Sequence, residues 1–201
     1  MEESDEDLVA RCQQGSDHAF EALVRRYQPR IIRFLETRLN NRQDAEDATQ
    51  QTFLQAHGGI GRFKSGHRFA PWLFTIARRQ GIDTLRRSGS RRRLAEKLRA
   101  EPPPGAAVDP SKLLGQQEDV DALWHWIRTQ LDSRSCEILW LRIQEDMDLA
   151  EIAAIMKLTR THVKVLLHRA RKSLCETLLS SATEPGPVET TAAPASQSCP
   201  R

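Results

Sequence analysis

The sequence has few aromatic residues, and its cysteines stand far apart. Only 5% of the 201 residues are Phe, Trp or Tyr, and no CxxC pair exists among Cys12, Cys136, Cys175 and Cys199. Zinc sites in small proteins are built from closely spaced Cys and His ligands, which this pattern does not offer. We therefore interpret the cysteines as buried or incidental thiols, and we expect neither a metal site nor a cofactor.

Long apolar runs are also missing. No stretch approaches the roughly 20 apolar residues of a membrane-spanning helix, and residues 1–7 are acidic, whereas signal and transit peptides are basic. The sequence contains no Gly-rich phosphate loop and no nucleophile elbow. We therefore expect a cytoplasmic protein that does not insert into a membrane and is not an enzyme.

The basic residues are unevenly distributed, although the formal net charge is only +3. They gather at residues 86–99 and 157–172, and no acidic side chain lies between Glu151 and Glu176. A basic stripe of this kind suits a phosphate backbone. A solvated helix face explains the charge equally well, so the charge alone leaves nucleic acid binding open.

Apolar residues recur at helical spacing along most of the chain, and no alternating strand pattern is present. The sequence therefore predicts an all-α protein with two small helical domains joined by a flexible linker, the second domain being a helix-turn-helix. The linker carries RRR at 91–93 and PPPG at 102–105, and its segment 90–99 is also compatible with a prolonged helix. A tail rich in Pro, Thr, Ala and Ser is expected to be disordered. The predicted bounds are 1–88 for the first domain, 89–118 for the linker, 119–179 for the second domain and 180–201 for the tail.

Local signals place the helices of the first domain. Gly15 interrupts the first apolar pattern, with Ser16 or Asp17 as the next N-cap. A helix is predicted from about Asp44 to residue 57, with Asp44 as its cap. Pro71 opens a further helix at a position where its missing N–H costs nothing. In the second domain, Asp132 or Ser133 is the predicted cap of a helix.

Residues 148–174 predict two helices around a tight turn at 157–159. In the second helix, an inward stripe recurs at spacings of four, three and four, through Val163, Leu167, Ala170 and Leu174. In a helix-turn-helix, this second helix enters the major groove, where early residues reach base edges and later cations contact phosphates. The predicted base-edge residues are Arg160, His162 and Lys164, and the predicted phosphate contacts are Arg169, Arg171 and Lys172.

Four segments of the chain together resemble the sigma factors of the sigma-70 family, in their extracytoplasmic-function group. The first joins DLV at 7–9 to AFEAL at 19–23, and the second is DAEDATQQTF at 44–53. The third is FAPWLFTIAR at 69–78, and the fourth joins LAEIA at 149–153 to VK at 163–164 and HRARK at 168–172. The four occur in the family's order and at its separations.

The resemblance implies binding to core RNA polymerase, through the β′ clamp helices and the β flap. The matching polymerase-binding residues are Asp44, Asp47, Gln50, Gln51 and Phe53. Asp47, Gln50 and Phe53, spaced i, i+3 and i+6, lie near one helical face, which suits a docking patch with a polar rim. The alternative reading of these residues is an acid in a first helical turn and a core phenylalanine. The group is often paired with an anti-sigma factor, a further candidate partner that nothing in this sequence specifies.

The resemblance also implies two promoter contacts. The loop at 64–68 matches the family loop that captures a flipped base, for which Phe63, Gly66, Phe69 and Trp72 offer apolar walls and flexibility. The alternative reading is that Phe69 and Trp72 are core residues, and for Trp72 the core reading is favoured. The implied minus-ten residues are Phe63, Lys64, Ser65, His67, Arg68, Arg78, Arg79, Arg86 and Arg87. The implied minus-thirty-five residues are Arg160, Thr161, His162, Lys164, Val165, His168, Arg169, Arg171 and Lys172.

Some positions depart from the family pattern. Gln51 stands where Glu is frequent, and Lys157 stands in the turn where Gly is common, so a non-Gly residue must accept that backbone geometry. Val165 and Leu166 replace a more polar pair; Val165 is suited to a thymine methyl group, and Leu166 to the protein interior. A stand-alone helix-turn-helix regulator is the competing reading, and the segment at 44–53 argues against it because such a regulator has no use for a polymerase-binding helix.

Overall fold

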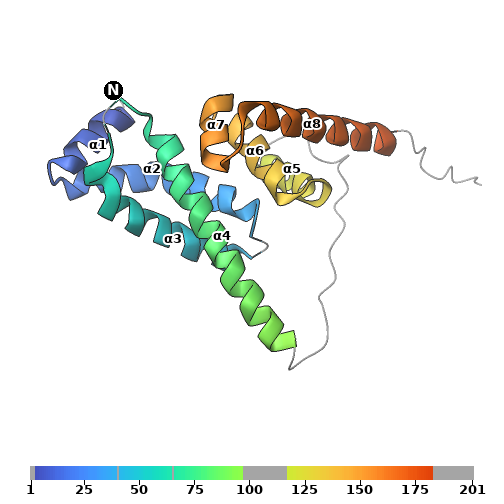
Figure 1. Ribbon diagram of the computed structural model, residues 1–201, viewed down its shortest axis with the longest axis horizontal. Coiled ribbons are helices and arrows are strands. Elements are labelled where there is room, and N and C mark those ends of the chain that lie inside the picture. Colours follow the sequence, from blue (N-terminus) through green and yellow to red (C-terminus); the bar gives the residue numbers. More distant parts are fainter. Residues whose placement is uncertain (1–2, 40, 65, 97–116, 183–201) are drawn as a thin grey trace, which may run out of the picture.

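The structure is a computed structural model that describes residues 3–39, 41–64, 66–96 and 117–182. In these ranges every regular element is a helix, which confirms the predicted all-α class (Figure 1). The elements are α1 (Asp5–Gln13), α2 (Asp17–Glu36), α3 (Arg42–Gly59), the 3-10 turn η1 (Ile60–Arg62), α4 (Phe69–Glu96), α5 (Gln117–Gln130), α6 (Ser133–Ile143), α7 (Leu149–Met156) and α8 (Arg160–Ala182).

Helices α1 to α4 form the N-terminal half, residues 3–96, around a core of large apolar side chains. Ser16 caps α2 as predicted, its Oγ accepting the backbone N–H of Ala19 at 3.4 Å. The cap of α3 is not Asp44 but Asn41, whose side chain accepts the N–H of Gln43 at 2.9 Å. Asn is as good a cap as Asp, so the helix begins two residues earlier than predicted. The inward side chains of α2 and α4 include Leu23, Tyr27, Ile31, Phe34, Leu73 and Phe74.

Helices α5 to α8 form the C-terminal half, residues 117–182. Asp132 caps α6 by accepting the backbone N–H groups of Arg134 and Ser135 at 3.1 and 3.3 Å, as predicted. The rings of Trp124 and Trp140 lie 4.7 Å apart and join α5 to α6. Apolar residues of α6, α7 and α8 complete this second core.

Helix α4 extends past residue 88, the predicted end of the first domain, and continues to Glu96, in line with the alternative that residues 90–99 prolong a helix. Arginine and leucine favour helices, which accounts for a helix in the first part of the predicted linker. Of the rest of that linker, residues 97–116 lie outside the described residues, and 117–118 already belong to α5. The predicted tail begins at 180, but α8 continues to Ala182, and residues 183–201 lie outside the described residues. Among the described helices, none combines the length and the apolar character needed to cross a bilayer.

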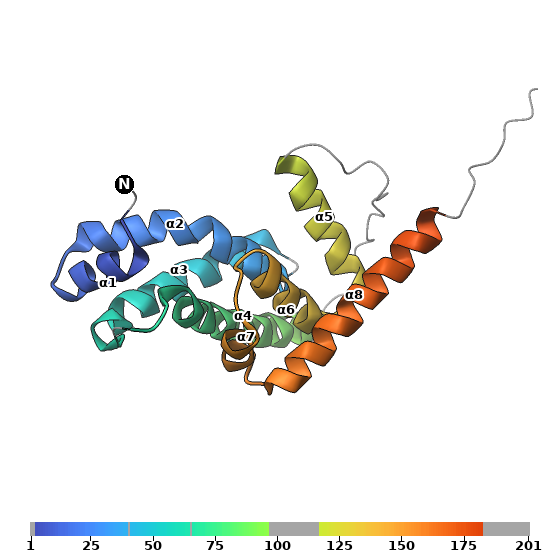
Figure 2. The same cartoon turned by 90° about the horizontal axis from the view of Figure 1, so that it is seen from above.

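The two halves touch each other along one side. Helix α7 packs against α4, and the two perpendicular views show α6 near the C-terminal end of α2 (Figure 1 and Figure 2). The segment from η1 to the start of α4 therefore faces the first helix of the helix-turn-helix. This contact brings several of the residues singled out in the sequence into one place.

Candidate nucleic-acid interface

The first helix of the helix-turn-helix, α7, begins at a reciprocal capping box. Asp148 Oδ1 accepts the backbone N–H groups of Ala150 and Glu151 at 2.6 and 2.8 Å, and the Asp148 N–H donates to Glu151 Oε2 at 2.9 Å. The hydrogen bond from the Glu151 backbone lowers the pKa of the Asp148 carboxyl. The cap thereby determines where α7 starts.

The turn between α7 and α8 has the strained geometry that the sequence implied. Lys157 adopts φ 54° and ψ 49°, the left-handed region that glycine usually fills. The N–H of Leu158 then donates to the Ala153 carbonyl at 2.9 Å, and the Leu158 side chain packs against the core. Thr159, which we did not single out from the sequence, accepts the N–H of His162 at 3.2 Å and caps α8.

Relieving this turn is expected to stabilise the protein. A non-Gly residue in the left-handed region destabilises the folded state by about 1–2 kcal/mol. Glycine removes this cost, but the greater conformational entropy of its unfolded chain offsets about 0.5–1 kcal/mol of the gain. We therefore expect Lys157→Gly to raise the free energy of unfolding by about 0.5–1 kcal/mol in a urea titration. The matched control, Lys172→Gly in the interior of α8, is expected to lower that free energy by about 1 kcal/mol. A loss of stability in both variants would contradict the strain at Lys157.

Helix α8 separates an inward from an outward face, as predicted. Val163, Leu167 and Ala170 are buried, while Leu166 and Leu174 pack partly against the core. Val165 is 40% exposed and therefore lies on the outward side. The predicted DNA-binding residues of this helix are all exposed: Arg160, Thr161, His162, Lys164, Val165, His168, Arg169, Arg171 and Lys172.

Helix α3 carries a second exposed stripe, and here the structure corrects the sequence reading. Phe53 is only 8% exposed and packs edge-on against Phe20 at 6.4 Å, so it belongs to the core and cannot present its ring to a partner. Its neighbour Leu54 is 60% exposed. The outward residues are spaced i, i+3, i+4 and i+7, which places them on one helical face: Asp47, Gln50, Gln51 and Leu54.

The helical period itself could have identified Leu54. Counting seven residues on from Asp47 reaches Leu54, whereas Phe53 is one residue short of the same face. Asp44, a further predicted contact, is half-buried at the start of α3. Of the predicted polymerase-binding residues, Asp47, Gln50 and Gln51 therefore lie in the exposed stripe. Leu54 takes the place of Phe53 as the apolar residue of that stripe.

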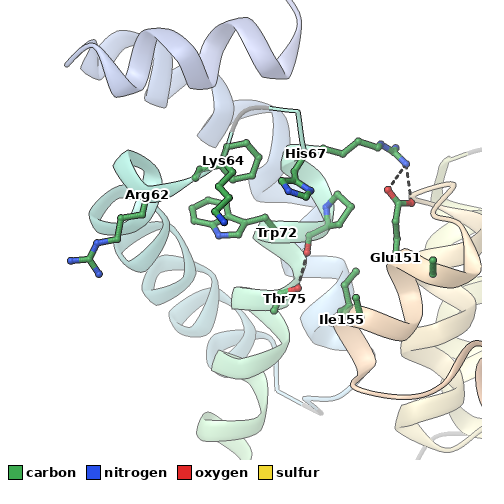
Figure 3. A pocket seen from close by; sticks show the side chains of 12 residues that line it. Arg62, Lys64, His67, Trp72, Thr75, Glu151 and Ile155 are labelled. Atoms are coloured by element: carbon green, nitrogen blue, oxygen red, sulfur yellow. Dashed lines mark hydrogen bonds and ion pairs between the residues drawn. The ribbon is translucent and has the colours of Figure 1, made fainter.

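A cavity of about 540 Å³ lies between the loop after η1 and helix α7 (Figure 3). Its aromatic wall is formed by Phe63 and Trp72, whose ring centroids are 5.3 Å apart. Phe69, 1% exposed, lies behind them in the core. Figure 3 shows Lys64 and His67 beside Trp72, with Ile155 and Glu151 of α7 facing them from the other side.

The loop above this cavity has one residue in a conformation that favours glycine and another that is held by α7. Gly66 adopts φ +88°, a conformation that side chains rarely accept. Arg68 is held by Glu151 of α7, its Nη1 donating to both carboxylate oxygens at 3.0 and 2.9 Å. The structure therefore brings Phe63, Lys64, His67 and Arg68 together around Trp72; Ser65 lies outside the described residues.

The predicted arginines of α4 differ in exposure. Arg79, Arg86 and Arg87 are exposed on the helix, in keeping with the predicted phosphate contacts. The side chain of Arg78 is only 11% exposed, and its Nε donates to Glu137 of the C-terminal half at 3.3 Å. Arg78 is therefore engaged within the protein in this state and does not present itself to a phosphate. Among the described residues, no three His, Cys, Asp or Glu side chains cluster as metal ligands would.

Comparisons with known proteins match both halves of the chain. The profile described as Sigma-70 region 2 matches residues 23–91, and that described as Sigma-70, region 4 matches residues 129–174. The RNA polymerase sigma factor CarQ of Myxococcus xanthus is 33% identical over 170 residues, which cover 85% of this chain and 95% of CarQ. The ECF RNA polymerase sigma factor BldN of Streptomyces coelicolor is 30% identical over 184 residues, 88% of this chain and 66% of BldN.

A solved structure shares the fold. The sigma factor RpoE of Bartonella quintana, crystallised with the anti-sigma factor NepR, superimposes with a TM-score of 0.64 at 22% identity. The superposition covers 80% of this chain and 96% of that one, so it includes helices of both halves.

Proposed function

Since the chain belongs to the sigma-70 family of RNA polymerase sigma factors, in its extracytoplasmic-function group, we propose that three of its surfaces divide the work of initiation. The protein binds core RNA polymerase and directs promoter-specific transcription initiation. In our proposal the exposed stripe of α3 binds the polymerase, the loop after η1 binds the minus-ten region, and α8 binds the minus-thirty-five region.

The stripe on α3 is the observation that carries this proposal. A leucine that is 60% exposed beside Asp47, Gln50 and Gln51 makes an apolar centre with a polar rim, the usual anatomy of a protein-binding patch. A stand-alone DNA-binding regulator has no use for such a helix. A pull-down with core polymerase tests the assignment, because a plain regulator would not be retained.

The cavity beside Trp72 is suited to an unstacked base. Aromatic side chains stack on any base, and cations at the entrance attract the strand that carries it. Phe63 and Trp72 supply the stacking surface, while Lys64 and His67 lie beside it. We infer that this cavity holds a base of the non-template strand during promoter melting, with Arg79, Arg86 and Arg87 along the adjoining phosphates.

Helix α8 supplies the duplex contact, and its salt dependence provides a test. Each cation that binds a phosphate releases counterions from DNA. In polymerase holoenzyme, we expect Lys164→Ala and Arg169→Ala each to weaken binding to minus-thirty-five duplex. The slope of log affinity against log salt should become less steep by about 1 for each cation that no longer binds a phosphate.

The control for this test is Arg25→Ala, an exposed arginine of α2 that lies 3.8 Å from Glu21 on its own helix. It removes the same kind of charge away from α8, so affinity and salt slope should stay as in the wild type. An unchanged slope in the α8 variants would mean that the DNA-binding face lies elsewhere.

Three further points belong to the same proposal. The protein acts in the cytoplasm, where promoter DNA and polymerase are found, and the chemistry of RNA synthesis resides in polymerase rather than in this chain. We also infer an anti-sigma factor as a partner, in analogy to RpoE, which was crystallised with one. Co-purification of the chain from its own cells, followed by identification of the bound proteins, tests this last point.

A further inference from the structure

The loop that follows η1 has little backbone structure of its own. Among its described residues, 63, 64 and 66–68, only Phe63 takes part in a backbone–backbone hydrogen bond, from its N–H to the Ile60 carbonyl at 3.0 Å. A segment with so few backbone hydrogen bonds opens readily unless side chains hold it. The position of the aromatic wall beside Trp72 therefore depends on side-chain contacts to the loop.

Within the described part of the chain, two polar side-chain contacts hold the loop, one at each end. At the end next to α4, Arg68 pairs with Glu151, which belongs to the C-terminal half. At the end next to η1, Nε2 of Gln13 in α1 donates to the Ile60 carbonyl at 2.9 Å and to the Phe63 carbonyl at 2.7 Å. Gln13 is thus the contact that holds the loop from within its own half.

The chemistry of the amide fits this double contact. The NH₂ group of Gln13 has two hydrogens, so it can donate to both carbonyls at once. Ile60 begins η1 and Phe63 is the residue that caps its end. Carbonyls at the end of a helical turn have no partner within the turn, so Gln13 supplies Phe63 with a donor from another helix.

Phe63 connects this contact to the proposed base-binding cavity. The centroid of its ring lies 5.3 Å from that of Trp72 and 6.1 Å from that of Phe69. A binding site works only if its residues are held within about 0.5 Å of the productive position. Gln13 does not line the cavity itself, so it acts on the aromatic wall through the backbone of Phe63.

Helix α1 is a well-anchored support for this contact. Leu8 and Val9 are buried in the core of the N-terminal half, and Asp5 accepts a hydrogen bond from the Tyr27 hydroxyl. The helix ends at Gln13 and lies beside η1 (Figure 1). The amide therefore stands at a defined place at the base of the loop.

We propose that Gln13 is a positioning residue for promoter melting, whose amide holds Phe63 where an unstacked base can stack on the aromatic wall. Helix α1 lies before residue 23, where the match to the region 2 profile begins, and none of the implied minus-ten contacts is in it. The inference rests on the proposed function of the loop.

The experiment compares Gln13→Met with the matched control Gln14→Met. Methionine keeps the length of the side chain but has no N–H donor, so Gln13→Met removes both hydrogen bonds. Gln14 is the next residue, it is also exposed, and its side chain forms no hydrogen bond with the described residues. Trp72→Ala serves as the reference for a lost stacking surface, and a melting curve checks that each variant is folded.

Fluorescence anisotropy of holoenzyme on a non-template minus-ten oligonucleotide gives the single-strand affinity, and hydrogen exchange of the free chain gives the protection of amides 61–68. We expect Gln13→Met to weaken single-strand binding by on the order of fivefold, the factor that corresponds to about one hydrogen bond. Its loop amides should exchange faster. Binding to minus-thirty-five duplex should not change, and Gln14→Met should match the wild type in every measurement.

Gln13→Lys tests whether a donor at this position is what matters. Lysine has a side chain of similar reach and donates hydrogen bonds, so it should restore most of the loop protection and of the single-strand affinity. Its charge also attracts DNA, so Gln14→Lys adds the same charge one position away as a control. Restoration in Gln13→Lys should exceed any gain in Gln14→Lys.

Two results would overturn the proposal. Wild-type loop exchange in folded Gln13→Met would show that the amide does not hold the loop. Wild-type single-strand affinity in Gln13→Met, where Trp72→Ala does weaken binding, would show that this hold has no part in binding the strand. If Trp72→Ala also binds as the wild type does, the assignment of the cavity to minus-ten DNA fails, and the inference fails with it. Trp72→Ala therefore distinguishes the two failures.

Discussion

Leu54→Asp is expected to remove most of the binding between this chain and core polymerase while leaving the fold intact. A few residues at the centre of a protein interface each cost about 2 kcal/mol or more when they are truncated, which is roughly a 30-fold weaker affinity, and Leu54 is expected to be one of them. An aspartate at this position would also place an uncompensated charge in the desolvated centre of the interface. Titration of labelled chain with core polymerase, followed by fluorescence anisotropy, measures the change.

The matched control is Leu123→Asp on α5, where the leucine is 41% exposed and lies outside the α3 stripe. Both substitutions put a charge in place of an exposed leucine, so the free energy of unfolding should change by no more than about 0.5 kcal/mol in either. Polymerase binding should fall only for Leu54→Asp. An equal loss of binding in the two variants would remove the reason for assigning the stripe on α3.

Comparing Leu54 with the adjacent Phe53 distinguishes an effect on polymerase binding from an effect on the stability of the fold. Phe53→Ala is expected to lower the free energy of unfolding by about 3–5 kcal/mol, because it empties a core position beside Phe20. Leu54→Asp is expected to leave that free energy nearly unchanged. Urea titrations of the two variants, read by circular dichroism, measure this contrast between adjacent residues.

Trp72→Ala is the second substitution with a large expected effect, and it acts on promoter melting. Removal of one stacking surface costs about 1–3 kcal/mol per base, or roughly 5- to 150-fold in affinity for single-stranded DNA. We expect this weakening for holoenzyme on an oligonucleotide of the non-template minus-ten sequence. Binding to minus-thirty-five duplex should not change, since the residues that line the cavity come from the loop, α4 and α7 rather than from α8.

Trp72→Phe is the conservative partner of that variant. It keeps an aromatic ring beside Phe63, so most of the single-strand affinity should be retained. Trp72 also lies close to Gly59, where an added Cβ would stand 3.4 Å from its Cζ2 atom, so both variants need a melting curve. Equal single-strand affinity for Trp72→Ala and the wild type would show that no base stacks in this cavity.

Periodic patterns allowed much of this fold to be predicted. The inward stripe of α8 and the caps at Ser16 and Asp132 follow from spacing and side-chain chemistry that act within a few residues. The left-handed turn at Lys157 was implied by the family resemblance, because glycine is common at that position in the family. The cap of α3 could not, because Asn41 and Asp44 both suit an N-cap and the choice depends on packing around the helix.

The sequence by itself determined the helical class, the two halves and the basic outward face of α8, since these depend on local periodicity and on the charge of consecutive turns. The tertiary structure decided which of two adjacent residues on α3 is exposed, because Phe20 packs on Phe53 and leaves Leu54 outside. It also decided that Arg68 and Arg78 are both paired with glutamates of the C-terminal half, Arg68 at the surface and Arg78 largely buried. Their partners Glu151 and Glu137 lie 83 and 59 positions along the chain, and only folding brings such distant charges together.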